Sequence, residues 1–283
     1  MDRPLYPFTA VVGQERAKQA LLCLAVEPRI GGVLLCGEKG TAKSTLVRAL
    51  GGLDGVRLLE LPVSATEDML LGGVELEAAV RTGCRTFQPG LLARADGAVL
   101  YADEVNLLPS ALTAALLDTL ETGVCRVERE GISYTCPARF SLVGTMNPEE
   151  GTLRPQLLDR FGLYVAVEGE REPEARKEVV RRTLDFEADP VGFRNRWARQ
   201  EARLAETLAA ARRILPQVAV GAAEEQEILL DSPIVESEDE PGAVDAPGVS
   251  GSKEPDEAAV ESTPVVEEDA VEPVPPVEEA IAG

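Results

Sequence analysis

The sequence predicts an α/β fold in which a mostly parallel β-sheet is covered by helices on both faces. Short apolar runs bounded by turn residues have the length and composition of buried strands. These runs lie at residues 32–36, 98–102 and 140–144. Segments with helical periodicity separate them, at residues 14–26, 44–50 and 110–120. Strands that alternate with helices are typical of a parallel sheet with both faces covered.

The chain after the predicted sheet changes character twice. Residues 174–182 and 199–214 are rich in arginine and have a sparse apolar stripe, which predicts two polar helices. Residues 221–283 hold 19 of the 49 acidic residues and one lysine, repeat proline and contain no aromatic residue. Such a segment cannot bury enough apolar surface to offset chain entropy. We therefore expect a folded domain over residues 1–220 and a disordered, acidic, proline-rich tail over residues 221–283.

Composition excludes several classes of site. Histidine is absent, so the chain has no histidine base and no histidine-containing zinc or haem site. The five cysteines form no CxxC pair and are odd in number, which favours buried structural thiols in a reducing compartment. Residues 1–220 are almost neutral and give no sign of nucleic-acid binding. With no signal-peptide core and no run of membrane-spanning length, we expect a cytoplasmic protein without a membrane partner.

The segment CGEKGTAKST, residues 36–45, has the pattern of a phosphate-binding loop. A predicted strand enters it and a predicted helix leaves it, which is the context that this motif requires. The predicted nucleotide-binding residues of the loop are Gly37, Glu38, Lys39, Gly40, Thr41, Ala42, Lys43, Ser44 and Thr45. Lys43 would reach the β- and γ-phosphates, and the hydroxyl of Ser44 would ligate Mg²⁺. Ala42 replaces the usual glycine, which is compatible with binding if its φ is negative; the alternative is a strand, turn and helix without a ligand.

Polar side chains follow the next two predicted strands. GAVLYADEVNLL places Asp103 and Glu104 directly after a buried strand. Asp103 suits a Mg²⁺ ligand and Glu104 a base that polarises the attacking water in phosphoryl transfer. Asn147 follows the third strand, at the edge where open parallel sheets bind ligands, and its amide suits the orientation of that water. Taken alone, an acidic pair after a strand is often only solvated, and Asn-Pro is a turn signal.

Two arginines flank a short apolar helix in LRPQLLDRFGL. Neither Arg154 nor Arg160 is placed to bend back to the phosphate-binding loop of its own chain. Arginine in such a position is typical of a finger that one subunit supplies to the site of a neighbour, and we predict this role for Arg160. The alternative is a local ion pair of Arg160 with Asp159 or another acid.

Together these motifs resemble the AAA+ ATPase subunit of the magnesium chelatases and of the related cobalt and nickel chelatases. The resemblance extends from about residue 6 to residue 220 and includes FTAVVGQERAKQALL, LPVSATEDMLLGG, FQPGLLARADGAVLYADEVNLL and GTMNPEEGTLRPQLLDRFGLYV. It implies an AAA+ P-loop fold with a five-stranded parallel sheet, a helical insertion near residues 63–81 and a β-hairpin insertion near residues 123–139. It also implies that Val12 and Gly13 lie beside the adenine of bound ATP.

The resemblance further implies an activity and a set of partners. In this family ATP and Mg²⁺ are the cofactors, Lys43, Glu104, Asn147 and Arg160 would be the catalytic residues, and Ser44 and Asp103 would hold the metal. The ATPase forms a hexameric ring with its sites between subunits. It works with a paired AAA+/integrin-like subunit, and hydrolysis drives insertion of Mg, Co or Ni into a tetrapyrrole that a separate large subunit holds. We expect this function for the chain.

The end of the sequence departs from the family pattern. Relatives continue past ILPQV into a helical lid with a second sensor arginine, whereas this chain has only Lys253 as a base beyond residue 220, so we expect an incomplete lid. Its tail resembles the acidic linker that precedes an integrin-like domain, although no DxSxS motif follows. Two alternatives therefore remain: an assembly subunit that binds nucleotide without hydrolysis, and a remodelling ATPase of the MoxR type, against which the ATED and PGLLARA segments argue.

Overall fold

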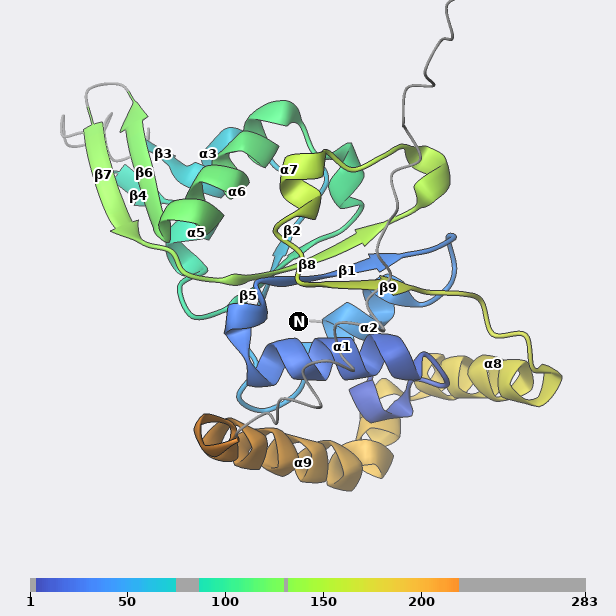
Figure 1. Ribbon diagram of the computed structural model, residues 1–283. Coiled ribbons are helices and arrows are strands. Elements are labelled where there is room, and N and C mark those ends of the chain that lie inside the picture. Colours follow the sequence, from blue (N-terminus) through green and yellow to red (C-terminus); the bar gives the residue numbers. More distant parts are fainter. Residues whose placement is uncertain (1–3, 75–86, 130–131, 219–283) are drawn as a thin grey trace, which may run out of the picture. The chain divides into compact units, whose positions relative to one another are not determined.

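The computed structural model describes residues 4–74, 87–129 and 132–218 (Figure 1). Contacts divide the chain into Met1–Gly221 and Ala222–Gly283, and the second unit lies wholly outside the described residues. The predictions of a disordered tail and of an incomplete lid therefore fall outside what the structure describes. Within the described residues, no helix is long and apolar enough to cross a membrane.

A five-stranded sheet forms the centre of the first unit. Its strands, in spatial order, are β2 (Leu58–Leu61), β5 (Val99–Ala102), β8 (Ser141–Met146), β1 (Gly32–Cys36) and β9 (Leu163–Ala166). All neighbouring strands are parallel, so their carboxyl ends share one edge of the sheet. The predicted fold class is confirmed. The three predicted runs correspond to β1, β5 and β8, the central strands, all of whose residues are buried.

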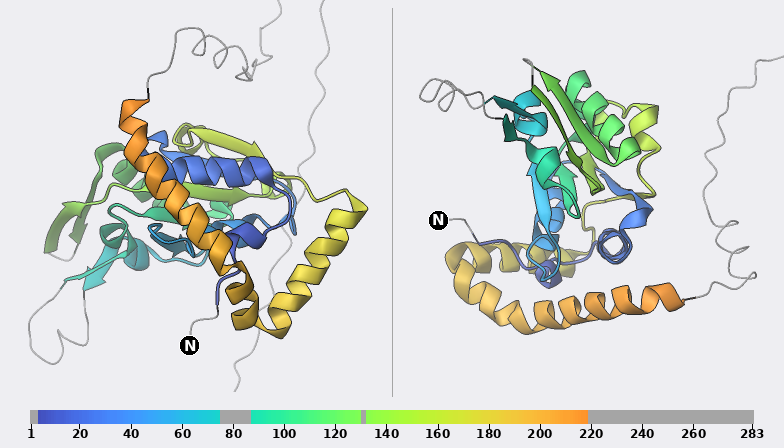
Figure 2. Two further views of the ribbon diagram at one scale, coloured as in Figure 1. Left: turned by 90° about the horizontal axis from the view of Figure 1, so that it is seen from below. Right: turned by 90° about the vertical axis from the view of Figure 1, so that its left-hand side faces the viewer.

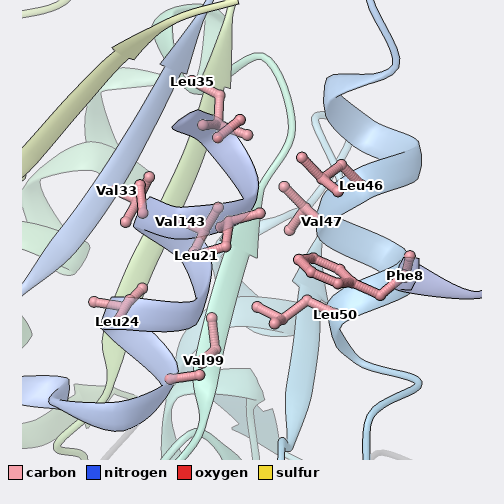
Figure 3. Close-up of a cluster of buried hydrophobic side chains, with 14 of the residues drawn as sticks. Phe8, Leu21, Leu24, Val33, Leu35, Leu46, Val47, Leu50, Val99 and Val143 are labelled. Atoms are coloured by element: carbon pink, nitrogen blue, oxygen red, sulfur yellow. The ribbon is translucent and has the colours of Figure 1, made fainter. Parts of the chain in front are cut away.

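Helices cover the sheet on both faces (Figure 1). On one face lie α1 (Glu15–Val26) and α2 (Lys43–Leu50), and on the other lie α3 (Glu67–Leu71), α5 (Leu91–Arg94), α6 (Ser110–Thr122) and α7 (Pro155–Leu158). Alternate residues of β1 serve the two cores, because successive side chains of a strand point to opposite faces. Val33 and Leu35 pack with α1 and α2 in the cluster drawn in Figure 3, whereas Leu34 packs on the other face.

Both predicted insertions contain the expected type of element. In the first, the Thr66 hydroxyl caps α3 by accepting from the N–H of Met69, and β3 (Gly72–Val74) pairs with β4 (Phe87–Pro89). Residues 75–86, between those strands, lie outside the described part. The second is an antiparallel hairpin of β6 (Val124–Arg129) and β7 (Ile132–Pro137), as predicted for residues 123–139.

Two helices follow the sheet and are longer than the sequence pattern predicted. They are α8 (Pro173–Ala188) and α9 (Pro190–Ile214), each with proline in its first turn. The Asp189 side chain accepts from the N–H of Gly192 and caps α9. α9 crosses α1 on the side away from the sheet (Figure 2). Aromatic contacts of Tyr6 with Phe186 and Phe193 join the N-terminal segment to both helices.

Candidate nucleotide-binding site

The phosphate-binding loop connects β1 to α2, as the sequence predicted. β1 ends at Cys36 and α2 begins at Lys43, so residues 37–42 form the turn. A Cβ atom on Gly37 would overlap the carbonyl oxygen of Val167, which follows β9. The N–H of Val167 in turn donates to the carbonyl of Cys36 at 2.7 Å. Only glycine fits position 37 in this arrangement, because the neighbouring strand approaches the main chain itself.

Ala42 adopts a conformation opposite to the one that we expected. Its φ is +63° and its ψ is +15°, in the left-handed region, whereas compatibility with binding was expected to require a negative φ. The turn from β1 into α2 imposes this conformation on whichever residue precedes Lys43. An L-residue there carries a steric cost of roughly 1–2 kcal/mol. The loop therefore has at position 42 the left-handed backbone conformation that glycine usually adopts, and Ala42 is strained there.

Replacing Ala42 with glycine is expected to raise the free energy of unfolding by up to about 1 kcal/mol, because the gain from relieved strain exceeds the cost of a more flexible unfolded chain. Chemical denaturation of the purified protein measures this. Ala49→Gly is the matched control, since Ala49 is buried inside α2, and we expect it to destabilise by about 1 kcal/mol. A loss of stability in Ala42→Gly equal to that of the control would contradict the strain.

The ammonium group of Lys43 lies in the mouth of the loop. Its Nζ donates to the carbonyl oxygens of Gly37 and Glu38, both at 2.6 Å, and to the hydroxyl of Thr41 at 3.3 Å. Burial lowers the pKa of Lys43 from its ordinary value, against the effect of the acids nearby. The lysine is thus held by uncharged acceptors, which phosphate oxygens with full negative charge would replace.

Ser44 and Asp103 meet across the edge of the sheet. The Ser44 hydroxyl donates to Oδ1 of Asp103 at 3.0 Å, and the Thr145 hydroxyl donates to the same oxygen at 2.6 Å. Arg48 reaches Oδ2 of Asp103 at 3.2 Å and also pairs with Glu60 at 2.6 Å. Burial would raise the pKa of the Asp103 carboxyl, but the hydrogen bonds and the charge of Arg48 outweigh it and hold that pKa below its ordinary value.

These two oxygen donors fit Mg²⁺. Magnesium takes hard oxygen ligands and is usually bound by one or two protein groups together with waters and substrate phosphates. A hydroxyl and an ionised carboxylate 3.0 Å apart supply that set. Across residues 4–74, 87–129 and 132–218 no cluster of three or more His, Cys, Asp or Glu side chains could hold a metal ion on its own. The described donors therefore fit a metal that arrives with a phosphate ligand.

A cavity of about 200 Å³ joins the loop to the ends of β5 and β8. It brings together most of the predicted site residues: Lys39, Gly40, Thr41, Ala42, Lys43, Ser44, Thr45, Asp103, Glu104 and Asn147. Asn147 is buried, and its side-chain oxygen accepts from the N–H of Glu149 at 3.2 Å. Lys39 forms an ion pair with Glu150, so one loop residue is tied to the turn after β8.

The remaining predicted nucleotide contacts lie beside this cavity. Glu38 contributes its carbonyl oxygen to Lys43. Val12 and Gly13 precede α1, and Gly13 has a φ of +65° with Glu170 so close that a Cβ would lie 2.8 Å from its carboxylate. The Gln14 side chain donates to the carbonyl of Glu168 at 2.7 Å. The segment that contains Val167 therefore links this N-terminal turn to the loop. That Val12 and Gly13 lie beside the adenine of bound ATP stays a prediction.

Arg160 lies at the opposite edge of the sheet from the loop. Its main-chain carbonyl approaches Gly32, the first residue of β1, whereas the loop follows Cys36 at the other end of the strand. Its guanidinium pairs with Glu121 at 3.3 Å, and its Nε is buried without a hydrogen-bond partner among the described residues. The local ion pair thus exists, with Glu121 instead of Asp159, and Arg160 does not join the cavity of its own chain.

Sequence reasoning missed two polar residues that contact Asp103. Thr145 lies on β8 two positions before Asn147, which directly follows that strand, and strand alternation would have placed both on one face. Arg48 follows Ser44 by four positions on α2, the spacing that puts side chains on one face of a helix. Neither belongs to a motif, so only these periodicities could have found them.

Comparisons with known proteins agree with this geometry. Residues 32–161 match the family model described as AAA domain (dynein-related subfamily). The chain is 41% identical to magnesium-chelatase subunit ChlI of Chlorella vulgaris, covering 76% of this chain and 72% of that protein. It is 45% identical to the magnesium-chelatase 38 kDa subunit of Acidiphilium rubrum, with coverages of 76% and 74%.

Two further matches extend the comparison. An uncharacterized protein of Mycobacterium tuberculosis is 53% identical over 76% of this chain, which spans only 36% of that protein's length. A solved structure, a cryo-EM-based model of the complex between subunits BchI and BchD of magnesium chelatase, has a TM-score of 0.53 and 42% identity, with coverages of 76% and 77%. The chain therefore belongs to the family of AAA+ ATPase subunits of magnesium chelatases.

Proposed function

We propose that this chain binds and hydrolyses ATP with Mg²⁺ as the motor subunit of a chelatase that inserts a divalent metal into a tetrapyrrole. One observation carries the proposal: the phosphate-binding loop, the acidic pair and Asn147 line a single cavity although they come from three separate strands. The names of the relatives, magnesium-chelatase subunits, support the substrate class.

In this proposal each side chain has a stated task. Lys43 and the main-chain N–H groups of the loop hold the phosphates. Bound Mg²⁺ would neutralise charge on the phosphate oxygens, and Ser44 and Asp103 are the residues that would hold it. Glu104 takes a proton from the attacking water, which Asn147 orients. The chain's contribution is position and charge, which is what phosphoryl transfer needs from a protein.

The proposal includes partners. A neighbouring copy would supply Arg160, because that residue lies at the sheet edge away from its own loop. We therefore propose a ring of subunits, a paired AAA+/integrin-like subunit, and a separate large subunit that holds the tetrapyrrole. The similarity to a structure of BchI in complex with BchD supports pairing with a second subunit. The inserted metal, Mg, Co or Ni, is cargo of the complex. A cytoplasmic location completes the proposal.

Steady-state hydrolysis of Mg-ATP across a range of protein concentrations tests the function. Specific activity should rise with concentration, because sites shared between subunits form only on assembly. Lys43→Ala should abolish both nucleotide binding and turnover. Nucleotide binding that depends on Lys43 without turnover at any concentration would favour the alternative, an assembly subunit that does not hydrolyse ATP. The absence of Lys43-dependent binding would overturn both.

A further inference from the structure

Thr145 connects the two acids of the site through a single buried hydroxyl. Its Oγ1 donates to Oδ1 of Asp103 at 2.6 Å and accepts from the main-chain N–H of Glu104 at 3.1 Å. The residue is 1% exposed. A hydroxyl has one proton and two lone pairs, and an ionised carboxylate can only accept, so the directions of both bonds are fixed.

We propose that Thr145 is a positioning residue that sets the side chain of Asp103 and the main chain of Glu104 with one hydroxyl group, and so orients the metal ligand and the base together. This rests on the function proposed above. Thr145 lies on β8 and the acids follow β5, the neighbouring strand, so the sheet itself sets the distance between them. The role follows from contacts in this structure and needs no contact between Thr145 and the nucleotide.

The backbone of Glu104 explains why a dedicated contact is needed. Glu104 has a φ of +48° and a ψ of +52°, in the left-handed region that a residue with a side chain enters at a steric cost. Strained residues persist where surrounding contacts hold them. The hydrogen bond from the Glu104 N–H to Thr145 is such a contact, and this backbone conformation brings Glu104 to the cavity.

The hydroxyl of Thr145 also remains available when the site is used. Ser44 donates to the same oxygen of Asp103, but its hydroxyl is among the groups that would hold Mg²⁺. Arg48 contacts the other oxygen and is shared with Glu60. Of the two hydroxyls that donate to Oδ1 in the hydrogen bonds of the described residues, those of Ser44 and Thr145, Thr145 is the one without a second task on the metal. Its short hydrogen bond can keep the carboxylate in place while Ser44 changes partner.

Thr145→Val and Thr145→Ser separate the hydroxyl from the shape of the side chain. Valine keeps the branched shape and loses the hydroxyl, whereas serine keeps the hydroxyl. For Thr145→Val we expect kcat to fall by about 10–100-fold and the Mg²⁺ concentration for half-maximal binding of a fluorescent ATP analogue to rise by about 10-fold, the usual effect of losing a group that orients a metal ligand. Thr145→Ser should stay within about 3-fold of the wild type in both.

Thr119→Val is the matched control, because Thr119 is equally buried on α6 and its hydroxyl bonds only to the Ala115 carbonyl in the described contacts. It should leave both readouts unchanged. Wild-type kcat and Mg²⁺ dependence in Thr145→Val would overturn the proposal. If Thr145→Val does not fold, Thr145→Ser and Thr145→Ala decide, since they differ by the hydroxyl alone, and equal defects in both would overturn it.

The proposed function and this inference fail in different ways. If nucleotide binding by the wild type is absent, or is the same in Lys43→Ala, the proposed function is wrong. If the wild type binds nucleotide with Mg²⁺ and Thr145→Val binds it with the same Mg²⁺ dependence, only the proposed role of Thr145 is wrong. The binding readout gives this answer even for a chain that binds without turnover.

Discussion

Glu104→Gln is expected to lower kcat for ATP by about 10²–10⁴-fold while nucleotide affinity stays within a few-fold of the wild type. Glutamine has the same size as glutamate but cannot accept the proton of the attacking water. The main chain of Glu104 bonds to Thr145 through its N–H, which the substitution leaves in place. The cavity should therefore keep its shape and lose its base. Steady-state kinetics and equilibrium binding of a fluorescent ATP analogue measure the two quantities.

The control for this prediction is Glu149→Gln. Glu149 is an exposed acid in the turn that follows Asn147, and only its main-chain N–H bonds to the Asn147 side chain. We expect wild-type kinetics for this variant. Lys43→Ala should give the opposite pattern, with affinity lost as well as turnover, because the proposal assigns the phosphates to this lysine. A kcat for Glu104→Gln within 3-fold of the wild type would show that another group takes the proton.

The central sheet was predictable because its strands are buried on both faces. β1 and β5 are continuous apolar runs and β8 is mostly apolar, the pattern of strands covered by helices on either side. The outer strands β2 and β9 were missed, since each has one neighbour and carries exposed positions within only four residues. Four-residue segments with mixed burial give no clear period. The resemblance to a known family predicted five strands, a number that periodicity alone did not give.

The site was predictable to the extent that chemistry follows strand ends. Asp103, Glu104 and Asn147 follow the carboxyl ends of parallel strands, and Lys43 and Ser44 begin the helix after the turn that follows β1, so a parallel sheet brings them to one edge. Backbone conformation was not predictable in the same way. The sign of φ at a residue that replaces glycine depends on the turn it completes, which composition does not show.

The extent of α9 was also beyond the sequence pattern. Helical periodicity predicted residues 199–214, whereas the helix begins at Pro190. Its first turns face mostly solvent, and Phe193 and Leu208 are the buried residues of the helix. Phe193 packs with Phe186 of the preceding helix α8 and with Tyr6, which is distant in the sequence. Such tertiary contacts stabilise a helix whose own apolar stripe is too sparse to detect.

Arg160→Ala is expected to lower kcat by about 10³–10⁵-fold, the range for loss of an arginine finger, without loss of nucleotide affinity. In the structure its guanidinium pairs with Glu121, whose side chain is exposed, while the side chain of Arg160 is 39% exposed. An exposed ion pair of this kind contributes at most about 1 kcal/mol, so it does not prevent Arg160 from reaching a neighbouring subunit. Glu121→Gln should therefore keep wild-type kinetics. Measuring Arg154→Ala beside Arg160→Ala shows which of the two arginines that flank α7 is needed for turnover.

Mixing two inactive variants decides whether Arg160 acts on its own site or on a neighbour's. Arg160→Ala keeps an intact loop, and Lys43→Ala keeps an intact arginine. If one subunit supplies the arginine to the next, an equal mixture completes about one quarter of the sites at random head-to-tail interfaces. Turnover should then return to about that fraction of the wild type on mixing. If Arg160 acted within its own chain, every site would lack one of the two groups. A mixture that assembles and stays inactive would thus exclude the finger in trans. Within its own chain, Arg160 is separated from the loop by the length of β1.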